Sequence, residues 1–290
     1  MITHPEKVLF PEDGITKGEL VEYYEAVAPV MLPHLRGRPV TLERYPSGLG
    51  KKGFWQKDVS RGFPEWLERV EVPKKGGSVH HPLASDTRSL VWMANQNSIT
   101  LHVWPSRVPS LFHPDVCLFD LDPARDDPDA VRVAALEVRD LLAELGLRSW
   151  VKTTGSKGFH VAVPLDGRAS FDEVASFAHR AGALLVRRNP ARLTQEFLKS
   201  DRGGRILLDT GRNGWSATFA ATYTVRARPG APVSAPCAWA EVERGDVAPR
   251  SFTLRSLRER LADVGDLWSD LLTSGQSLGG PEERLRQLLA

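Results

Sequence analysis

The chain has 290 residues, of which 41% are hydrophobic and 26% are charged, and its formal net charge is +2. This length suffices for one large domain or two closely packed ones with a substantial core. We expect no membrane span, which needs roughly 18 consecutive apolar residues, and no signal peptide. Cys117 and Cys237 lack metal-binding spacing, so both are expected to be reduced core residues of a cytoplasmic protein.

The first hundred residues predict a mixture of helices and strands. Thr16 and Glu19 form a capping box, in which each side chain bonds the other residue's backbone amide, and this predicts a helix over 18–31. The other elements expected here are strands and turns over 38–60, a short helix over 86–95 and a strand over 98–104.

A proline-punctuated connection over 105–114 separates two modules, which we place at 1–105 and 106–290 and expect to pack as one globular unit. The second module alternates strands with helices. Its expected strands are 116–122, 149–154, 159–165, 205–209 and 216–228, and its expected helices are 127–145, 170–186 and 251–272.

Three aspartates end apolar strands in the second module. Asp120 and Asp122 share one face of their strand, with backbones about 6–7 Å apart, because side chains alternate along a strand. Asp209 ends another apolar strand and is expected at the same edge. Such carboxylates repel unless cations lie between them, and Mg²⁺ and Mn²⁺ prefer oxygen ligands. The alternative is that these acidic residues only end the strands.

A glycine-containing turn joins two apolar strands at 153–160. Glycine permits a close backbone approach, and exposed amides, the Ser156 hydroxyl and Lys157 are suited to phosphate oxygens. The turn lacks the GxxxxGK[ST] spacing of a Walker loop. The alternative interpretation is a plain hairpin turn.

Basic residues near strands form two further candidate phosphate sets. Lys199, Arg202 and Arg205 precede the third aspartate, and Arg226 and Arg228 are expected on one face of the strand 216–228. Arginine binds phosphate through two parallel hydrogen bonds. The alternative is that these side chains are solvated.

The N-terminal module carries candidate DNA contacts. Lys7 and Lys17 lie near a helix N-terminus, where an anion is favoured. Phe54 and Trp55 follow Lys51 and Lys52, a combination that can stack on bases beside a phosphate backbone. The alternative is that one of the two rings lies in the core.

Taken in chain order, these motifs resemble the polymerase domain of bacterial ligase D, a member of the archaeo-eukaryotic primase superfamily. The resemblance extends from Lys7 to about Leu272. It is carried by FDLDP at 119–123, TTGSKGFH at 153–160 and LLDTGRN at 207–213, supported by LHV around His102 and by YTVRAR at 223–228. The chain departs from the family in having Trp55 where phenylalanine is usual and a less aromatic sequence after Asp209.

The resemblance implies an α+β fold with a mixed or antiparallel catalytic sheet flanked by helices and a smaller N-terminal α/β module that binds DNA ends. It implies two divalent metal ions, Mn²⁺ preferred and Mg²⁺ accepted, held by Asp120, Asp122 and Asp209. It assigns a further set of residues to the incoming nucleotide: His102, Thr154, Ser156, Lys157, His160, Lys199, Arg202, Arg226 and Arg228. The residues assigned to DNA are Lys7, Lys17, Lys51, Lys52, Phe54 and Trp55.

The implied activity is extension of a primer 3′-OH with NTPs or dNTPs at gapped or overhanging DNA ends that carry a 5′-phosphate, in bacterial non-homologous end joining at the nucleoid. Ku and a DNA ligase are the implied protein partners. Three alternatives stay open: a stand-alone primase-polymerase of replication or damage tolerance, a non-catalytic module that binds DNA ends, and a metal-dependent nuclease.

Overall fold

The computed structural model describes residues 2–59 and 62–290. Met1, Ser60 and Arg61 lie outside the described residues, so the prediction for 38–60 is assessed only up to residue 59. The fold is α+β, as predicted, with helices, a mixed sheet and antiparallel sheets.

Two compact units make up the chain, and their boundaries differ from the predicted division at 105/106. The first unit comprises Met1–Pro109, Thr218–Ala235 and Phe252–Asp266, and the second comprises the three remaining segments. The chain first passes from the first unit to the second after Pro109, within the predicted connection over 105–114. However, 218–235 and 252–266 return to the first unit, because they pair with and pack on elements that precede them by more than a hundred residues.

The first unit holds a four-stranded sheet, two hairpins and three helices among the described residues. Its strands are β1 (Val8–Phe10), β2 (Ile15–Thr16), β3 (Val40–Arg44), β4 (Phe54–Gln56), β5 (Arg69–Lys74), β6 (Gly77–Pro82), β7 (Ser98–Val103) and β13 (Phe219–Ala220). Its helices are α1 (Lys17–Leu35), α2 (Thr87–Asn95) and α6 (Leu257–Val264). The four-stranded sheet has the order β13-β7-β3-β4, so β4 lies at an edge.

Helix α1 begins where the sequence predicts. The Thr16 hydroxyl accepts from the Glu19 amide, and the Glu19 carboxylate accepts from the Thr16 amide, which confirms the capping box. The helix ends at Leu35 rather than at the predicted Met31, although it contains Pro33. Leu35 is fully buried, and this packing holds the last turn although proline removes one helical hydrogen bond.

The second unit is built around a six-stranded sheet with the order β11-β12-β8-β10-β9-β14. Its strands are β8 (Val116–Pro123), β9 (Trp150–Thr153), β10 (Phe159–Pro164), β11 (Leu193–Thr194), β12 (Ile206–Asp209) and β14 (Pro236–Cys237). Its helices are α3 (Pro128–Glu144), α4 (Phe171–Arg188), α5 (Trp239–Arg244) and α7 (Gly279–Leu289). Its 3-10 turns are η1 (Lys199–Arg202), η2 (Gly211–Asn213) and η3 (Ser269–Thr273).

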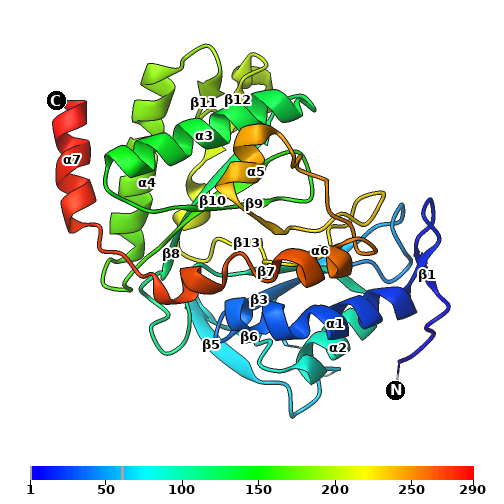
Figure 1. Cartoon of the computed structure of the whole chain (residues 1–290). Helices are drawn as coiled ribbons and strands as arrows, with labels where there is room; N and C mark the ends of the chain where they lie inside the picture. The colour runs from blue at the N-terminus through cyan, green and yellow to red at the C-terminus, as the bar shows by residue number, and fades with distance from the viewer. Residues whose placement is uncertain (1, 60–61) are drawn as a thin grey trace. The chain divides into compact units, whose positions relative to one another are not determined.

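The sheet of the second unit is mixed, since β11 and β12 are parallel and the other pairs are antiparallel. Helix α3 packs against β8 and β10, and α4 packs against β8 and β11 (Figure 1). Both helices start as predicted, because Asp127 caps the first and a Ser170–Glu173 capping box opens the second. The central strand β8 is thereby covered by two amphipathic helices, which fixes the position of the residues at its end.

Two predictions for the later part of the chain need correction. The strand expected over 216–228 is only the short β13, because Tyr223 has a left-handed φ of 68° and the chain turns back so that the Arg226 amide donates to Pro232. The helical region expected over 251–272 contains α6 and η3, separated at Gly265, which has a φ of 66°. Helix α7 was not predicted, since Gly279 and Gly280 at its start weaken the helical signal.

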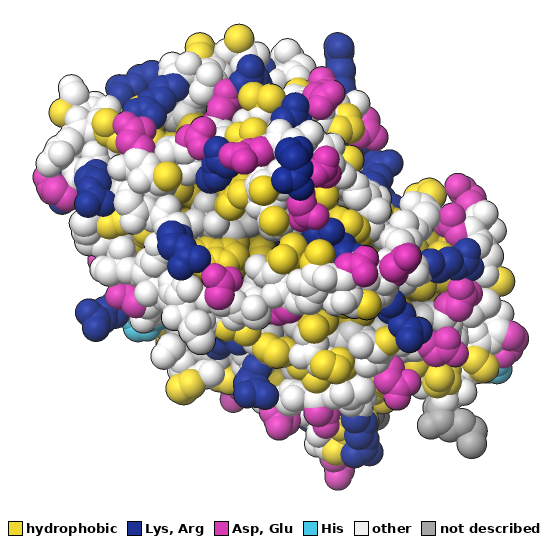
Figure 2. All heavy atoms as spheres, in the orientation of Figure 1, with side chains coloured by type: hydrophobic (Ala, Val, Ile, Leu, Met, Phe, Trp, Pro, Cys, Tyr) yellow, Lys and Arg dark blue, Asp and Glu magenta, His cyan; other side chains and the backbone are white. Residues whose placement is uncertain are grey.

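Cys117 and Cys237 are both free and buried, as predicted. None of the helices in the described residues combines the length and the hydropathy that crossing a membrane requires. On the face shown in Figure 2, Lys and Arg side chains are interspersed with Asp and Glu, in agreement with the small net charge.

Candidate active site

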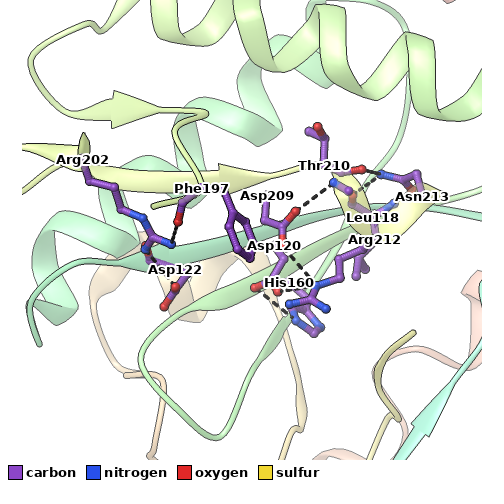
Figure 3. Close-up of polar contacts among 11 residues, drawn as sticks. Leu118, Asp120, Asp122, His160, Phe197, Arg202, Asp209, Thr210, Arg212 and Asn213 are labelled. Atoms are coloured by element: carbon purple, nitrogen blue, oxygen red, sulfur yellow. Dashed lines mark hydrogen bonds and ion pairs between the residues drawn. The ribbon is translucent and has the colours of Figure 1, made fainter. Parts of the chain in front are cut away.

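Strand register brings two of the predicted aspartates and one predicted histidine into a row across the sheet of the second unit. Asp120 of β8 is paired with Asp209 of β12 on one side and with His160 of β10 on the other (Figure 3). Directly opposed residues in a sheet have Cβ atoms about 4.5–5.5 Å apart. The His160 Nε2 atom lies 3.3 Å from Asp120 Oδ1, so these two side chains are in contact.

Asp122 lies on the same face of β8 as Asp120, two residues further along, and is paired in register with Leu207. Its carboxylate is directed to an arginine: Arg202 Nη1 donates to Asp122 Oδ2 at 3.0 Å. The Arg202 guanidinium also donates to the carbonyls of Glu196 and Phe197, so this buried side chain joins the 196–202 segment to β8.

A second arginine bridges the other two aspartates. Arg212 Nε lies 3.2 Å from Asp120 Oδ2 and 3.2 Å from Asp209 Oδ2 (Figure 3). Two carboxylates from neighbouring strands thus converge on one cationic nitrogen, which offsets their mutual repulsion. The sequence assigns no role to Arg212, although it lies in the LLDTGRN motif, because its contact with Asp120 depends on the pairing of β12 with β8.

The pKa values at this site follow from burial and charge. Burial raises the pKa of the Asp209 carboxyl, and the charge of Asp120 adds to this, while Arg212 acts in the opposite direction. Burial alone would lower the pKa of the Arg212 guanidinium, but Asp120 and Asp209 more than offset burial and raise it. The site therefore holds closely coupled charges whose balance depends on a cation between them.

The short turn after Asp209 is anchored by Asn213, another residue that the sequence analysis missed. The Leu118 amide donates to Asn213 Oδ1 at 2.7 Å, and Asn213 Nδ2 donates to the carbonyls of Leu118 and Thr210. The Gly211 amide donates to Asp209 Oδ1 at 2.8 Å. These bonds fix the backbone on both sides of Arg212 relative to strands β8 and β12.

The turn between β9 and β10 is a hairpin held by the Thr154 hydroxyl, which accepts from the amides of Ser156 and Gly158. Gly155 has a left-handed φ of 64°. A Cβ atom at Gly158 would lie 1.6 Å from the Leu121 carbonyl oxygen, so only glycine allows the hairpin to approach β8 this closely. Ser156 and Lys157 are partly exposed, and Lys157 lies two residues before β10.

The predicted nucleotide set is divided between the two units. In the second unit, His160 joins the aspartate row, Arg202 holds Asp122, and Lys199 is exposed on η1. The three predicted residues of the first unit are His102 on β7 and, in the turn after β13, the partly exposed Arg226 and the exposed Arg228. Arg226 and Arg228 do not share a strand face, because the expected strand is absent there and the Arg228 amide donates to the Arg226 carbonyl.

Phe54 and Trp55 are both exposed, by 44% and 57%, on the edge strand β4. The Trp55 ring packs on His102 with centroids 4.5 Å apart, while the Arg44 guanidinium lies 5.3 Å from the Phe54 centroid. The alternative in which one ring lies in the core is thus excluded. His102 Nε2 also lies 3.5 Å from Glu43 Oε2, which adds Glu43 to the cluster without any signal in the sequence motifs.

The predicted DNA-binding lysines differ in their surroundings. Lys51 and Lys52 are exposed just before β4. Lys17 is buried, and its ammonium donates to the carbonyl and hydroxyl of Thr3, whereas Lys7 donates to the Pro46 carbonyl. The Lys17 amide donates to the Lys7 carbonyl at 2.8 Å, which brings the two residues close together. Burial lowers the pKa of Lys17, and the neighbouring charge of Lys7 lowers it further.

Among the residues that the structure describes, no group of three or more His, Cys, Asp or Glu side chains is arranged to hold a metal ion. The donor set nevertheless fits a divalent cation. Asp120 and Asp209 are hard oxygen ligands that already converge on one positive atom, Arg212 Nε, and Asp122 lies on the same strand face. The metal set of three aspartates stays a prediction.

The α+β fold, the carboxylates on adjacent strands of a mixed sheet and the lysine-bearing glycine turn agree with the class that the sequence motifs imply, the primase-type nucleotidyl transferases. A family model described as the primase-polymerase domain of LigD matches residues 16–268. The chain belongs to this LigD primase-polymerase family, whose members are metal-dependent nucleotidyl transferases.

The relatives found by sequence are longer proteins. The multifunctional non-homologous end joining protein LigD of Mycolicibacterium smegmatis is 35% identical over 277 residues, which are 93% of this chain and 36% of that protein. The protein of the same name from Pseudomonas aeruginosa is 35% identical over 291 residues, covering 98% of this chain and 34% of that protein. The chain thus spans about a third of the length of these relatives.

One solved structure of a single domain is similar to this chain over nearly its whole length. The polymerase domain of Mycobacterium tuberculosis ligase D, determined in complex with DNA, superposes with a TM-score of 0.89 at 33% sequence identity. The match covers 95% of this chain and 99% of that domain.

Proposed function

We propose that this chain is a DNA-dependent nucleotidyl transferase that adds nucleotides to a primer 3′-OH in the repair of DNA ends. The observation that carries the proposal is the row of Asp209, Asp120 and His160 on adjacent strands, with Asp122 on the same face of β8. Transfer of a nucleotide concentrates negative charge at the α-phosphate, and an acidic site that recruits cations is suited to that chemistry.

Asp120, Asp122 and Asp209 would hold two divalent ions, with Mn²⁺ as the preferred metal and Mg²⁺ as the alternative. When bound, such ions lower the pKa of the attacking hydroxyl and neutralise charge on the triphosphate and the leaving pyrophosphate. His160 orients Asp120 through the 3.3 Å contact between them. The bonds of Asn213 to β8 hold the turn that carries Arg212.

The triphosphate would be bound by the β9–β10 hairpin. Ser156 and Lys157 are partly exposed there, and the Thr154 hydroxyl fixes the shape of the turn. A lysine in such a turn supplies a mobile positive charge for phosphate oxygens. The proposal retains Lys199 of the second unit and His102, Arg226 and Arg228 of the first unit as nucleotide contacts, each to be tested by its effect on the KM for NTP.

DNA would contact the first unit through the exposed pair Phe54 and Trp55 and the adjacent Lys51 and Lys52. Exposed aromatic rings on an edge strand can stack on bases, and the lysines suit the phosphate backbone. Lys7 and Lys17 would take the 5′-phosphate, because an anion relieves the repulsion between the two ammonium groups. The names of the relatives support a role in non-homologous end joining. Ku and a DNA ligase as partners, and action at the nucleoid, belong to the proposal through the family resemblance alone.

The proposal is tested by extension of a labelled primer on gapped DNA with and without a 5′-phosphate, comparing Mn²⁺ with Mg²⁺ and NTPs with dNTPs. Metal-dependent addition stimulated by the 5′-phosphate is the expected result. Addition that ignores this phosphate, or that begins without a primer, would favour a stand-alone primase-polymerase. Tight end binding without addition would identify a non-catalytic module, and metal-dependent shortening of the primer a nuclease.

A matched pair of variants assigns the chemistry to the site. Asp120→Asn and Asp122→Asn should each abolish nucleotide addition while leaving the affinity for DNA ends unchanged, since the predicted DNA contacts lie in the other unit. Extension that survived both substitutions would show that the aspartates are not the metal site.

A further inference from the structure

The contact between Arg212 and the two carboxylates has the geometry of a counter-ion. A single guanidinium nitrogen, Nε, lies 3.2 Å from an oxygen of Asp120 and 3.2 Å from an oxygen of Asp209. These oxygens come from adjacent strands whose register is fixed, and the Arg212 side chain is 42% exposed. The arginine therefore reaches the two carboxylates from the solvent side.

The backbone that carries Arg212 has little freedom to move. Asn213 is bonded to both the amide and the carbonyl of Leu118 on β8, and Gly211 is bonded to Asp209. A change in the position of the guanidinium must therefore come from rotation of the arginine side chain. Its partial exposure leaves room for that rotation.

We propose that Arg212 is a built-in counter-ion that competes with a divalent metal ion for Asp120 and Asp209. It stabilises the metal-free protein, and it must leave the two carboxylates when they bind a metal. The inference rests on the proposed function only in taking these two aspartates as metal ligands. Arg212 thereby sets the concentration of metal at which the site becomes loaded.

Arg212 and a metal ion compete because both are cations that need the same carboxylate oxygens. An oxygen that lies 3.2 Å from a guanidinium nitrogen cannot also face a divalent ion at about 2.0–2.2 Å without charge repulsion between the two cations. In the metal-free site, by contrast, removal of Arg212 takes this counter-ion away from two facing carboxylates, each of which is only 14% exposed. The same side chain thus favours the empty site and disfavours the loaded one.

The test uses Arg212→Gln in the full chain, with Mn²⁺ alone as the probe. Binding is measured from the electron paramagnetic resonance signal of free Mn²⁺, and the melting temperature is measured in a chelator. The variant should bind Mn²⁺ about fivefold more tightly, which corresponds to the loss of one modest ion-pair competitor. It should also melt at a lower temperature without metal and gain more in melting temperature when Mn²⁺ is added.

The matched control is Arg188→Gln on α4, which removes an equal charge from an ion pair with Glu144 on α3 of the same unit. The control should leave Mn²⁺ affinity unchanged. Arg212→Lys provides a second variant if Arg212→Gln folds poorly, because it keeps the charge but loses the planar guanidinium, and its Mn²⁺ affinity should lie between those of the wild type and Arg212→Gln.

Unchanged or weaker Mn²⁺ binding by both Arg212 variants would overturn the inference. That result would leave the proposed function intact as long as the wild-type chain extends primers. Failure of the wild-type chain to bind Mn²⁺ at all would instead contradict the proposed metal site itself, so the two failures are distinguishable.

Discussion

Two polar clusters, one in each unit, are assembled in different ways. In the second unit, Asp209, Asp120 and His160 occupy paired positions on three adjacent strands, and Arg212 of η2 forms ion pairs with both carboxylates. In the first unit, the cluster contains one carboxylate, Glu43, against His102, with the Trp55 ring covering the histidine.

The difference shows how each cluster is stabilised. Asp120 and Asp209, the acidic part of the row, place like charges side by side. This pair needs cations and gains no stability from burial. The cluster around His102 contains one acid, one imidazole and one large ring, so hydrogen bonding and packing hold it without an external cation. Substitutions in the aspartate cluster of the second unit should therefore change chemistry and metal binding. Substitutions in the His102 cluster of the first unit should change DNA affinity and stability.

After the two substitutions on β8, the largest effect is expected from Asp209→Asn. Loss of this carboxylate should slow nucleotide addition by roughly 10²–10³-fold or more, because it removes charge that acts on the developing transition state. Single-turnover primer extension at saturating NTP and Mn²⁺ measures the effect. Asp140→Asn, at an exposed position of α3 in the same unit, is the control and should retain the full rate. A rate within threefold of wild type would remove Asp209 from the chemistry.

Gly158→Ala tests whether the fold around Asp120 and Asp209 depends on the close approach of the β9–β10 hairpin to β8. The new methyl group would overlap the Leu121 carbonyl, so we expect the free energy of unfolding to fall by about 2–4 kcal/mol. Gly280→Ala is the control, because that position in α7 has no heavy atom within 4 Å of the added Cβ. The control should be neutral or slightly stabilising in the same urea titration. Equal stability of both variants would mean that β8 and the hairpin adjust freely.

Trp55→Ala tests the first unit's role in DNA binding. Loss of one stacking ring should weaken binding to a gapped duplex by about 1–3 kcal/mol, as measured by fluorescence anisotropy. Trp66→Ala is the control, since Trp66 is also part-exposed in the first unit but packs under Arg88. A similar loss in both variants would indicate a general destabilisation of the unit.

The smallest effect is expected from Glu43→Gln and depends on pH. Burial acts to raise the Glu43 pKa, but hydrogen bonds from His102, Tyr45 and Thr100 outweigh it, so the pKa lies below its ordinary value of 4.5. Between the lowered pKa and 4.5, the unfolded chain binds more protons than the folded chain. The stabilisation from Glu43 is therefore lost as the pH falls below 4.5. Glu43→Gln should reduce stability by about 1 kcal/mol at neutral pH, and the difference should shrink in acid. A difference that is constant with pH would contradict this assignment.

Local sequence signals predicted much of the secondary structure. Capping residues Thr16, Asp127 and Ser170 start the three longest helices as expected, because a cap acts within one turn of chain. Continuous apolar runs located β8, β10 and β12, and with them the aspartates. The strand expected over 216–228 failed because a left-handed residue, Tyr223, interrupts a β-rich sequence.

The sequence by itself determined that Asp209 ends β12 and that Asp120 and Asp122 share a face of β8, since both follow from neighbours a few positions away. Only the tertiary structure decided that Asp209 pairs with Asp120, that Arg212 bridges them and that Glu43 meets His102. It also decided that 218–235 and 252–266 belong to the first unit. These outcomes depend on register and packing between segments tens to hundreds of residues apart, which no local periodicity encodes.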